Sequence, residues 1–551
     1  MSRPSISPEL LALSQEFDMS ADDLADAAKK IAKACHRMCD RWQKSNTQDE
    51  VIRRQLHGIS KKHRVSLPNK VSLQEVMNRL CDQSWWKRAL RKRLQLVEYV
   101  AIQAGDVHDK AGKYVSGKAM ARAVRNKRRI EELLESLYAV NQTTLQAIPM
   151  SEIAAQSLAN PQNRRMAMMA RLKGIEAYAM DQGNIGLMLT ITASSRMHAR
   201  HISGATNERY DGTSPRAAQA HLNNVWRCAM RKLGHLGIKV RGMRVTEPHH
   251  DACPHWHVLV FVNPEHANTM IQVVRGYALR DSPDEPGAQE RRFDVEWIDT
   301  AKGGALAYVA KYVAKSIDGE GVDVDNETGE SGKESAPRIV AWAHLWNVRQ
   351  FQFFGVPPIT PNREIYRLKD LSSQSEGIAA AHQAVMANNY GAYLHACDSY
   401  GLNFKPIYIE RESTRYADEK VQRLQGLMAG AIDLALPENL TTRTDEWRIE
   451  SRRDEATKGE FSPPWTRFNN CAPNDFIEVS ATSTHSETST MFEFQEEKKG
   501  GGFAERKVPR DGHRYQTRGG SIGSRTPRSI AGKAKSARTE QIHINSGSMT
   551  S

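Results

Sequence analysis

The stretch "EPHHDACPHWHVLVFV" (residues 247–262) places four histidines, an aspartate and a glutamate immediately before an apolar run. The apolar run predicts a buried strand, in which successive side chains point to opposite faces of a sheet. His255 and His257 are two positions apart, so their imidazoles lie on the same face. Trp256 between them points to the other face, toward whatever packs behind the sheet.

Two histidines on one face could bind a divalent metal ion together with a nearby carboxylate. Glu247 ends the preceding predicted strand, and it is the third candidate ligand by its spacing and strand position. Imidazoles and a carboxylate accept Mg²⁺, Mn²⁺ or a later transition metal, and three protein ligands leave positions open for a phosphate oxygen. His249 and His250 fall in the turn and are weaker candidates. The alternative for an isolated pair is two histidines that hydrogen-bond within a sheet.

A second stretch, "AYVAKYVAKS", combines tyrosines and lysines at helical spacing. Tyr308, Lys311, Tyr312 and Lys315 fall within one arc of about 100° on a helix, and apolar residues occupy the opposite side. A tyrosine oxygen that attacks a phosphodiester needs help in losing its proton, and it needs positive charge near the transition state. Lysines and a metal ion supply that charge. The alternative is an amphipathic surface helix with half-buried tyrosines and solvated lysines.

Strands and helices interleave around these two motifs, between about residues 185 and 318. Adjacent strand pairs imply an α+β fold with a central, largely antiparallel sheet flanked by helices. The predicted strands are residues 185–195, 238–247, 255–262 and 292–299. The predicted helices are residues 214–237, a segment from Asn263 onward, and residues 301–318.

Composition divides the whole chain into four regions. They are a helical N-terminal region (1–180), the α+β domain (181–360), a helical C-terminal region (361–465) and a basic tail (466–551). The Ser, Thr, Gly, Lys and Arg content of the tail predicts disorder. Residues 318–335 read as an acidic, Gly-rich surface loop. Their "GESGKES" lacks the first Gly and the Ser or Thr of a phosphate-binding loop, so the sequence shows no ATPase motif.

The formal net charge of +13 is concentrated in two segments. Residues 85–129 carry thirteen Lys or Arg against three acids, and residues 498–538 carry twelve against two. Such segments favour a polyanionic partner, although the tail segment reads equally well as a flexible terminus without a specific role. Seven dispersed cysteines fit a reducing cytosol. No signal segment or membrane span is visible, so we expect a soluble protein.

Taken together, the motifs resemble those of the HUH endonucleases, which have a sheet bearing His-hydrophobic-His and a helix bearing one or two tyrosines. "LMLTIT" resembles the family's first strand motif, "PHWHVLVF" the metal motif and "YVAKYVAKSID" the tyrosine motif. The chain looks like the two-tyrosine subgroup, specifically the replication gene A proteins of P2-like bacteriophages. "CDQSWWKRALRKRL", "NPQNRRMAMMARLKG" and "VRQFQFFGVP" extend this likeness from about residue 80 to 370. Trp256 is bulkier than the aliphatic residue common between the two histidines.

The resemblance implies a site-specific single-strand DNA endonuclease and ligase that initiates rolling-circle replication. A metal ion held by the two histidines and Glu247 would polarise the scissile phosphate at an origin. One tyrosine would attack, form a 5′-phosphotyrosyl link and release a 3′-hydroxyl, and the second would cleave the regenerated origin. Lys311 and Lys315 would hold or neutralise the phosphate.

The implied partners are origin DNA, single-stranded or nicked, together with a host polymerase and a host helicase in the bacterial cytoplasm. No membrane partner is implied. A plasmid relaxase or a single-strand transposase would use the same chemistry. However, relaxases often carry a third metal-binding histidine and a nucleophile near the N-terminus, whereas here the tyrosines follow the metal strand. A non-catalytic DNA-binding protein with structural histidines is the alternative from a different class.

Overall fold

The computed structural model of the chain describes residue 12 and residues 21–451. Within the latter range the positions left out are 64, 68–71, 300–303, 326–327, 369–370, 372 and 413–419. The tail predicted over residues 466–551 lies outside the described residues.

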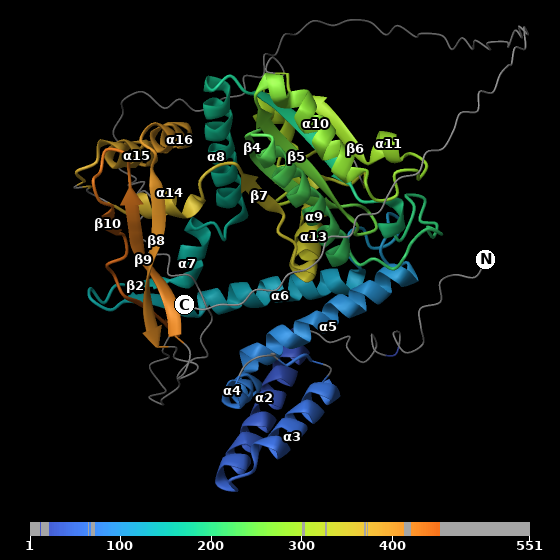
Figure 1. The fold of residues 1–551 in the computed structure, drawn as a ribbon. Helices are drawn as coiled ribbons and strands as arrows, with labels where there is room; N and C mark the ends of the chain where they lie inside the picture. Colours follow the sequence, from blue (N-terminus) through green and yellow to red (C-terminus); the bar gives the residue numbers. More distant parts are fainter. Residues whose placement is uncertain are drawn as a thin grey trace, which may run out of the picture. The chain divides into compact units, whose positions relative to one another are not determined.

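Five strands form the central sheet, and every pairing between neighbours is antiparallel. Their order is β6-β3-β5-β4-β7, so β5 lies in the middle between β3 and β4. Figure 1 labels β4, β5, β6 and β7 of this sheet. The strands are β3 (Ile185–Thr192), β4 (Val240–Pro248), β5 (Pro254–Val262), β6 (Phe293–Trp297) and β7 (Phe351–Phe354). The antiparallel sheet expected from the sequence is confirmed, and β7 adds an edge strand that the sequence interpretation did not assign.

Helices cover both faces of this sheet. One face packs against α9 and α10, and its core includes Trp256. The opposite face packs against α8 and α12, and its core includes Leu259 and Phe261, which share a face with the two histidines of β5. The four helices are α8 (Pro161–Asp181), α9 (Pro215–His235), α10 (Pro264–Ala278) and α12 (Gly304–Lys315). The opposite orientation predicted for Trp256 is therefore confirmed.

Helix α9 shows why these segments fold as the sequence indicates. Ser214 caps the helix by accepting a hydrogen bond from the Ala217 N–H, and Pro215 occupies the first turn. One apolar stripe of this helix is buried, and it consists of Ala218, Leu222, Val225, Ala229 and Leu233. Its burial fixes which side of α9 faces the sheet.

Helices dominate the described part of the first 180 residues, as expected. They are α2 (Ala21–Lys44), α3 (Asp49–His63), α4 (Leu73–Cys81), α5 (Gln83–Ala104), α6 (Gly117–Glu135), α7 (Met150–Gln156) and α8. Helices α2 to α5 enclose a core of their own, which includes Leu80, Trp86 and Leu90. Two short strands, β1 (Leu137–Asn141) and β2 (Ala147–Pro149), interrupt the helical region. No helix among the described residues is long and apolar enough to cross a membrane.

The expected helical region 361–465 is correct only as far as Ser399. In this region lie α14 (Ile359–Ile365), α15 (Glu376–Met386) and α16 (Tyr390–Ser399). Two further helices, α11 (Ala288–Arg291) and α13 (Gly332–Trp346), precede it. Helix α16 is followed by β8 (Asn403–Glu412), β9 (Lys420–Gly430), β10 (Glu438–Thr441) and β11 (Trp447–Ser451). The first three form a separate antiparallel sheet, and β11 pairs with β1. Leu427 and Ala429, two positions apart, are both buried, so this segment follows the period of a strand and the helical expectation is wrong there.

Candidate metal centre and tyrosine helix

The register of the central sheet brings Glu247, His255 and His257 together. Glu247 on β4 lies directly opposite His255 on β5. His257, two positions further along β5, lies opposite Thr190 of β3. Residues opposite one another on antiparallel strands share a face, so all of these side chains project from the same side of the sheet.

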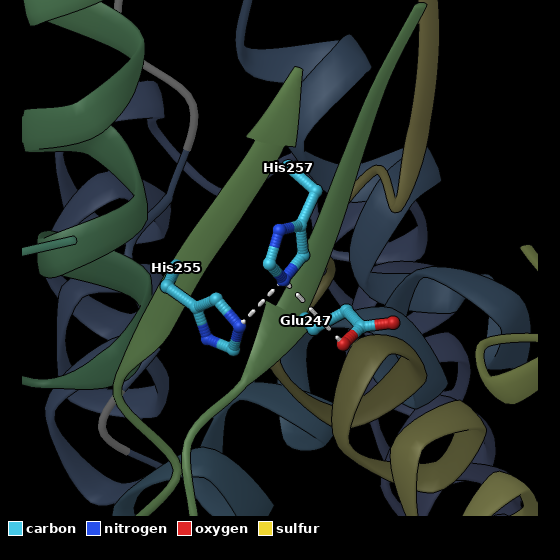
Figure 2. Close-up of side chains that lie close together, drawn as sticks. All are labelled: Glu247, His255 and His257. Carbon is cyan, nitrogen blue, oxygen red and sulfur yellow. Dashed lines mark hydrogen bonds and ion pairs between the residues drawn. The ribbon is translucent and has the colours of Figure 1, made fainter. Parts of the chain in front are cut away.

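The two histidines and the glutamate form a compact buried cluster, shown in Figure 2. The Nε2 atoms of His255 and His257 lie 3.1 Å apart, and His257 Nε2 lies 4.0 Å from Glu247 Oε2. Two nitrogen ligands at right angles on one ion lie about 3 Å apart, so the histidine pair has the separation that a shared metal ion requires. One ligand atom from each residue lies within 4.8 Å of the others. No other group of this kind occurs in the described part of the chain.

The surroundings of the cluster favour the protonation state that a metal ligand needs. Burial, together with the neighbouring His249 and His257, lowers the pKa of His255 well below its ordinary value. A neutral imidazole is the form that binds a metal ion. The buried Nδ1 of His255 has no hydrogen-bond partner within the described structure. Burial raises the pKa of the Glu247 carboxyl, although Lys315 beside it opposes the shift. Two nitrogens and a carboxylate suit Mn²⁺, Mg²⁺ or a later transition metal.

Helix α12 places Tyr312 against the histidine pair. Its phenol ring stacks on the His257 imidazole, with the centroids 3.7 Å apart and 19° between the planes. Val309 and Val313, on the other side of the helix, are fully buried against the sheet, which confirms the predicted helix and its packing side. Burial, with the charge of Glu247 adding to it, raises the pKa of Tyr312 to about 12. The phenol is therefore protonated at neutral pH.

Tyr308 and Lys311 lie on the same helix as Tyr312. Tyr308 is half-buried and packs against the core that α12 shares with the sheet. The Lys311 side chain is exposed, and its Nζ lies 4.8 Å from the centroid of the Tyr312 ring. Lys311 therefore provides a solvent-accessible positive charge beside this tyrosine.

Lys315 has different surroundings from Lys311, although the sequence predicted the same role for both. Its side chain is buried. Its Nζ lies 3.2 Å from Glu247 Oε2 and 2.7 Å from Asp325 Oδ1. The charge of Lys315 is thus directed at two buried carboxylates.

Three polar residues beside the cluster were not predicted from the sequence: Thr190, Ser316 and Asp325. Thr190 Oγ1 lies 3.3 Å from His257 Nδ1, and Ser316 Oγ donates a hydrogen bond of 3.1 Å to Glu247 Oε1. Thr190 belongs to the motif "LMLTIT" and shares a face with His257, so strand alternation could have indicated it. Ser316 directly follows the tyrosine motif's last lysine. No local pattern distinguishes Asp325 from the acidic residues around it.

The turn between β4 and β5 carries His249 and His250, the two weaker candidates. The His249 ring stacks on His255, with the centroids 4.0 Å apart. His250 is buried, and its carbonyl oxygen accepts a hydrogen bond of 3.3 Å from the Tyr114 N–H. Neither belongs to the candidate metal-binding group of Glu247, His255 and His257.

Glu176 of α8 fixes where the tyrosine helix begins. Its Oε1 accepts a hydrogen bond of 2.6 Å from the Ala305 N–H, which would otherwise lack a partner at the start of a helix. The preceding Gly304 has a φ of 66°, in the left-handed region that favours glycine. A Cβ at this position would lie 2.6 Å from Glu176 Oε1.

Gly304→Ala is therefore expected to lower the free energy of unfolding by about 1–3 kcal/mol, because the backbone strain and the contact with Glu176 both act at this position. Chemical denaturation measures the loss, and hydrogen exchange of α12 locates it. The matched control is Gly276→Ala in α10, where a Cβ would meet no atom within 4 Å. Equal unfolding free energies for the two variants would contradict the expectation.

Comparison with known proteins assigns the chain to a family. A family model described as bacteriophage replication gene A protein (GPA) matches residues 7–320. The chain belongs to the bacteriophage replication gene A protein family. This membership confirms the resemblance to the replication gene A proteins of bacteriophages.

Individual relatives also match the chain over most of its length. The replication gene A protein of Escherichia phage 186 is 34% identical over 416 residues, covering 72% of this chain and 59% of that protein. The replication gene A protein of Escherichia phage P2 is 31% identical, covering 71% and 54%. A probable replication endonuclease from prophage-like region 1 of Salmonella typhi is 30% identical, covering 71% and 51%. The chain thus spans about half the length of the curated relatives it matches. No solved structure matches it.

Proposed function

We propose that the chain is a metal-dependent, site-specific single-strand DNA endonuclease and ligase that initiates rolling-circle replication of phage DNA. Membership of the gene A family supports this function, and so does an HUH-type arrangement of a histidine-bearing sheet and a two-tyrosine helix. The observation that carries the proposal is the 3.7 Å stacking of Tyr312 on His257. This contact supports the proposal because the phenol that we propose as the nucleophile lies beside the proposed metal ligands.

The proposed reaction is a transesterification at a DNA phosphate. The phenol oxygen of a tyrosine attacks phosphorus and loses its proton, and the bond from phosphorus to the 3′ oxygen breaks. The products are a 5′-phosphotyrosyl link and a 3′ oxygen that takes up a proton to become a hydroxyl. A divalent ion bound by Glu247, His255 and His257 would polarise the phosphate. Lys311, exposed beside Tyr312, stabilises the negative charge that develops on the phosphate oxygens.

Two tyrosines four residues apart on one helix allow the site to act twice without releasing the DNA. The second tyrosine cleaves the regenerated origin, and the freed 3′-hydroxyl attacks the first phosphotyrosyl ester and rejoins that strand. Tyr312 contacts His257, whereas no ring contact of Tyr308 with the histidines occurs among the described residues. We therefore assign the first cleavage to Tyr312.

Origin DNA, single-stranded or in a nicked duplex, is the proposed substrate in the host cytoplasm. A host polymerase would extend the 3′-hydroxyl, and a host helicase would unwind the duplex because this sequence contains no phosphate-binding loop. The basic residues of α5 and α6 would attract the DNA backbone. Their contribution should weaken as salt increases.

The test is covalent capture of DNA by the full chain. Single-stranded fragments covering the genome that encodes the chain are incubated with the protein and Mn²⁺ or Mg²⁺, and products are separated on a denaturing gel. We expect one fragment to form a protein adduct that resists denaturation. Tyr308→Phe with Tyr312→Phe is expected to abolish the adduct, and Tyr312→Phe by itself to reduce the first cleavage more than Tyr308→Phe does.

Tyr408→Phe is the matched control, because Tyr408 is 52% exposed on β8 and lies outside the proposed site. It should form the adduct at the wild-type level. Persistent adducts in the double variant would refute the assignment of both tyrosines. Adducts that form equally well in EDTA would refute the metal dependence.

A further inference from the structure

The segment 318–335, predicted to be an acidic surface loop, contains a buried carboxylate. Asp325 is 1% exposed, whereas its neighbours Asp323 and Val324 are exposed. A tight turn holds it: the Asp325 N–H donates to the Glu330 carbonyl at 2.7 Å, and the Asp325 carbonyl accepts from Gly329 N–H at 2.7 Å. This backbone arrangement directs one acidic side chain of the segment into the protein.

Inside the protein, Asp325 meets the lysine of the tyrosine helix. Lys315 Nζ lies between Asp325 Oδ1 at 2.7 Å and Glu247 Oε2 at 3.2 Å. All three side chains are buried, so solvent screens their charges little. With Glu247 ionised, two carboxylates and one ammonium leave one negative charge on this group. Without Asp325 the pair of Glu247 and Lys315 would be neutral.

Tyr114, in the connection between α5 and α6, holds the second oxygen of Asp325. Its hydroxyl donates a hydrogen bond of 2.5 Å to Asp325 Oδ2, and its ring centroid lies 5.7 Å from Lys315 Nζ. Tyr114 is fully buried and has a φ of 67°, a conformation that bulky residues rarely adopt. Its N–H also donates to the His250 carbonyl, so the same residue joins the β4–β5 turn to Asp325.

We propose that Asp325 is a positioning residue of the metal site. Its carboxylate holds Lys315 and keeps the net charge of the site negative enough to accept a divalent cation. The inference rests on the metal site of the proposed function. A buried ammonium 3.2 Å from a metal-ligand oxygen repels an incoming cation unless a second carboxylate balances it. Asp325 is that carboxylate. The role is assigned to a residue about seventy positions from the histidines, in a segment without a recognisable motif.

The test is the affinity of the DNA-free full chain for Mn²⁺, measured by calorimetry or by the electron paramagnetic resonance of unbound Mn²⁺. Asp325→Asn is expected to weaken binding at least about ten-fold, which is the usual scale for residues that support metal ligands. Lys315→Met is expected to tighten binding, because it removes the competing cation. The double variant should return to within about three-fold of the wild type, since it removes one charge of each sign. Asp323→Asn, in the same segment but exposed, is the matched control.

This order of affinities separates the proposed role from simple structural damage, which would lower the affinity in every variant. Thermal unfolding in EDTA checks that each variant is folded. If Asp325→Asn does not fold, the comparison is made between Lys315→Met and the double variant. The double variant lacks the negative charge of Asp325 that Lys315→Met retains. The proposal therefore requires the double variant to bind Mn²⁺ more weakly than Lys315→Met.

Two results would overturn the inference and leave the proposed function standing. They are an Asp325→Asn affinity equal to that of Asp323→Asn, and weaker binding by Lys315→Met than by the wild type. Wild-type Mn²⁺ affinity in His255→Ala would instead overturn the metal site itself, and this inference with it. The outcomes therefore distinguish a failure of Asp325 from a failure of the proposed function.

Discussion

Replacing His255 or His257 by alanine is expected to lower the affinity for Mn²⁺ by more than about 100-fold and to remove detectable covalent DNA capture. Each substitution deletes one of the three proposed ligands, and loss of a direct ligand costs more than the 10–100-fold typical of supporting residues. No other group of metal-type ligands occurs among the described residues. Mn²⁺ binding is measured on the DNA-free chain, and adduct formation on a denaturing gel.

Two further histidines serve as controls for this experiment. His266→Ala changes an exposed side chain on α10 and should leave both measurements unchanged. His249→Ala removes the ring stacked on His255 but no ligand, so Mn²⁺ affinity should fall by less than about ten-fold. Equal losses for His249→Ala and His255→Ala would show that the turn, and not the strand pair, holds the metal ion.

Trp256→Ala is expected to lower the free energy of unfolding by about 3–5 kcal/mol, as for other large aromatic residues truncated in a core. Trp256 is fully buried on the sheet face opposite the histidines. Its Nε1–H donates a hydrogen bond of 3.0 Å to Gln219 Oε1, and the Arg244 guanidinium lies 3.8 Å from its ring centroid. Truncation therefore leaves a cavity, deprives the buried Gln219 Oε1 of its donor and removes the ring that the Arg244 guanidinium contacts.

Denaturant-induced unfolding of the full chain measures this loss. Trp297→Ala is the matched control, because Trp297 lies on a strand of the same sheet but its side chain is 52% exposed. This substitution should change the free energy of unfolding by no more than about 0.5 kcal/mol. Trp256→Phe keeps an aromatic ring in the core and should retain Mn²⁺ binding, because the ligands lie on the other face. Similar unfolding free energies for the two alanine variants would contradict the orientation of Trp256.

Much of the central architecture could be read from periodicity. The alternation in "HWHVLVFV" placed the two histidines on one face and Trp256 on the other, and β5 has this arrangement. The helix predicted over residues 214–237 is also present, as α9, because its Ser214 cap and its apolar stripe depend on residues within a few turns of one helix. Local rules of this kind hold when one face of an element is buried.

The expected helix was wrong for β8 and β9, where charged residues obscure the apolar alternation of a strand. Strands β8 and β9 pair over most of their length, but they carry many Lys, Arg and Glu residues, and a helix was expected there. Only one side of this hairpin packs against the core, through residues such as Leu427 and Ala429. The pairing partner, which decides between strand and helix, is a tertiary property.

The sequence by itself determined the antiparallel sheet, the histidine pair, the tyrosine helix and the family, because each depends on residue types at short spacings. Only the tertiary structure decided which further groups surround the histidines. The β4–β5 register places Glu247 opposite His255, and the packing of α12 separates buried Lys315 from exposed Lys311. Asp325 reaches Lys315 through a turn distant in the chain from the histidines. Contacts of this kind depend on how distant segments pack, so no periodic pattern in the local sequence predicts them.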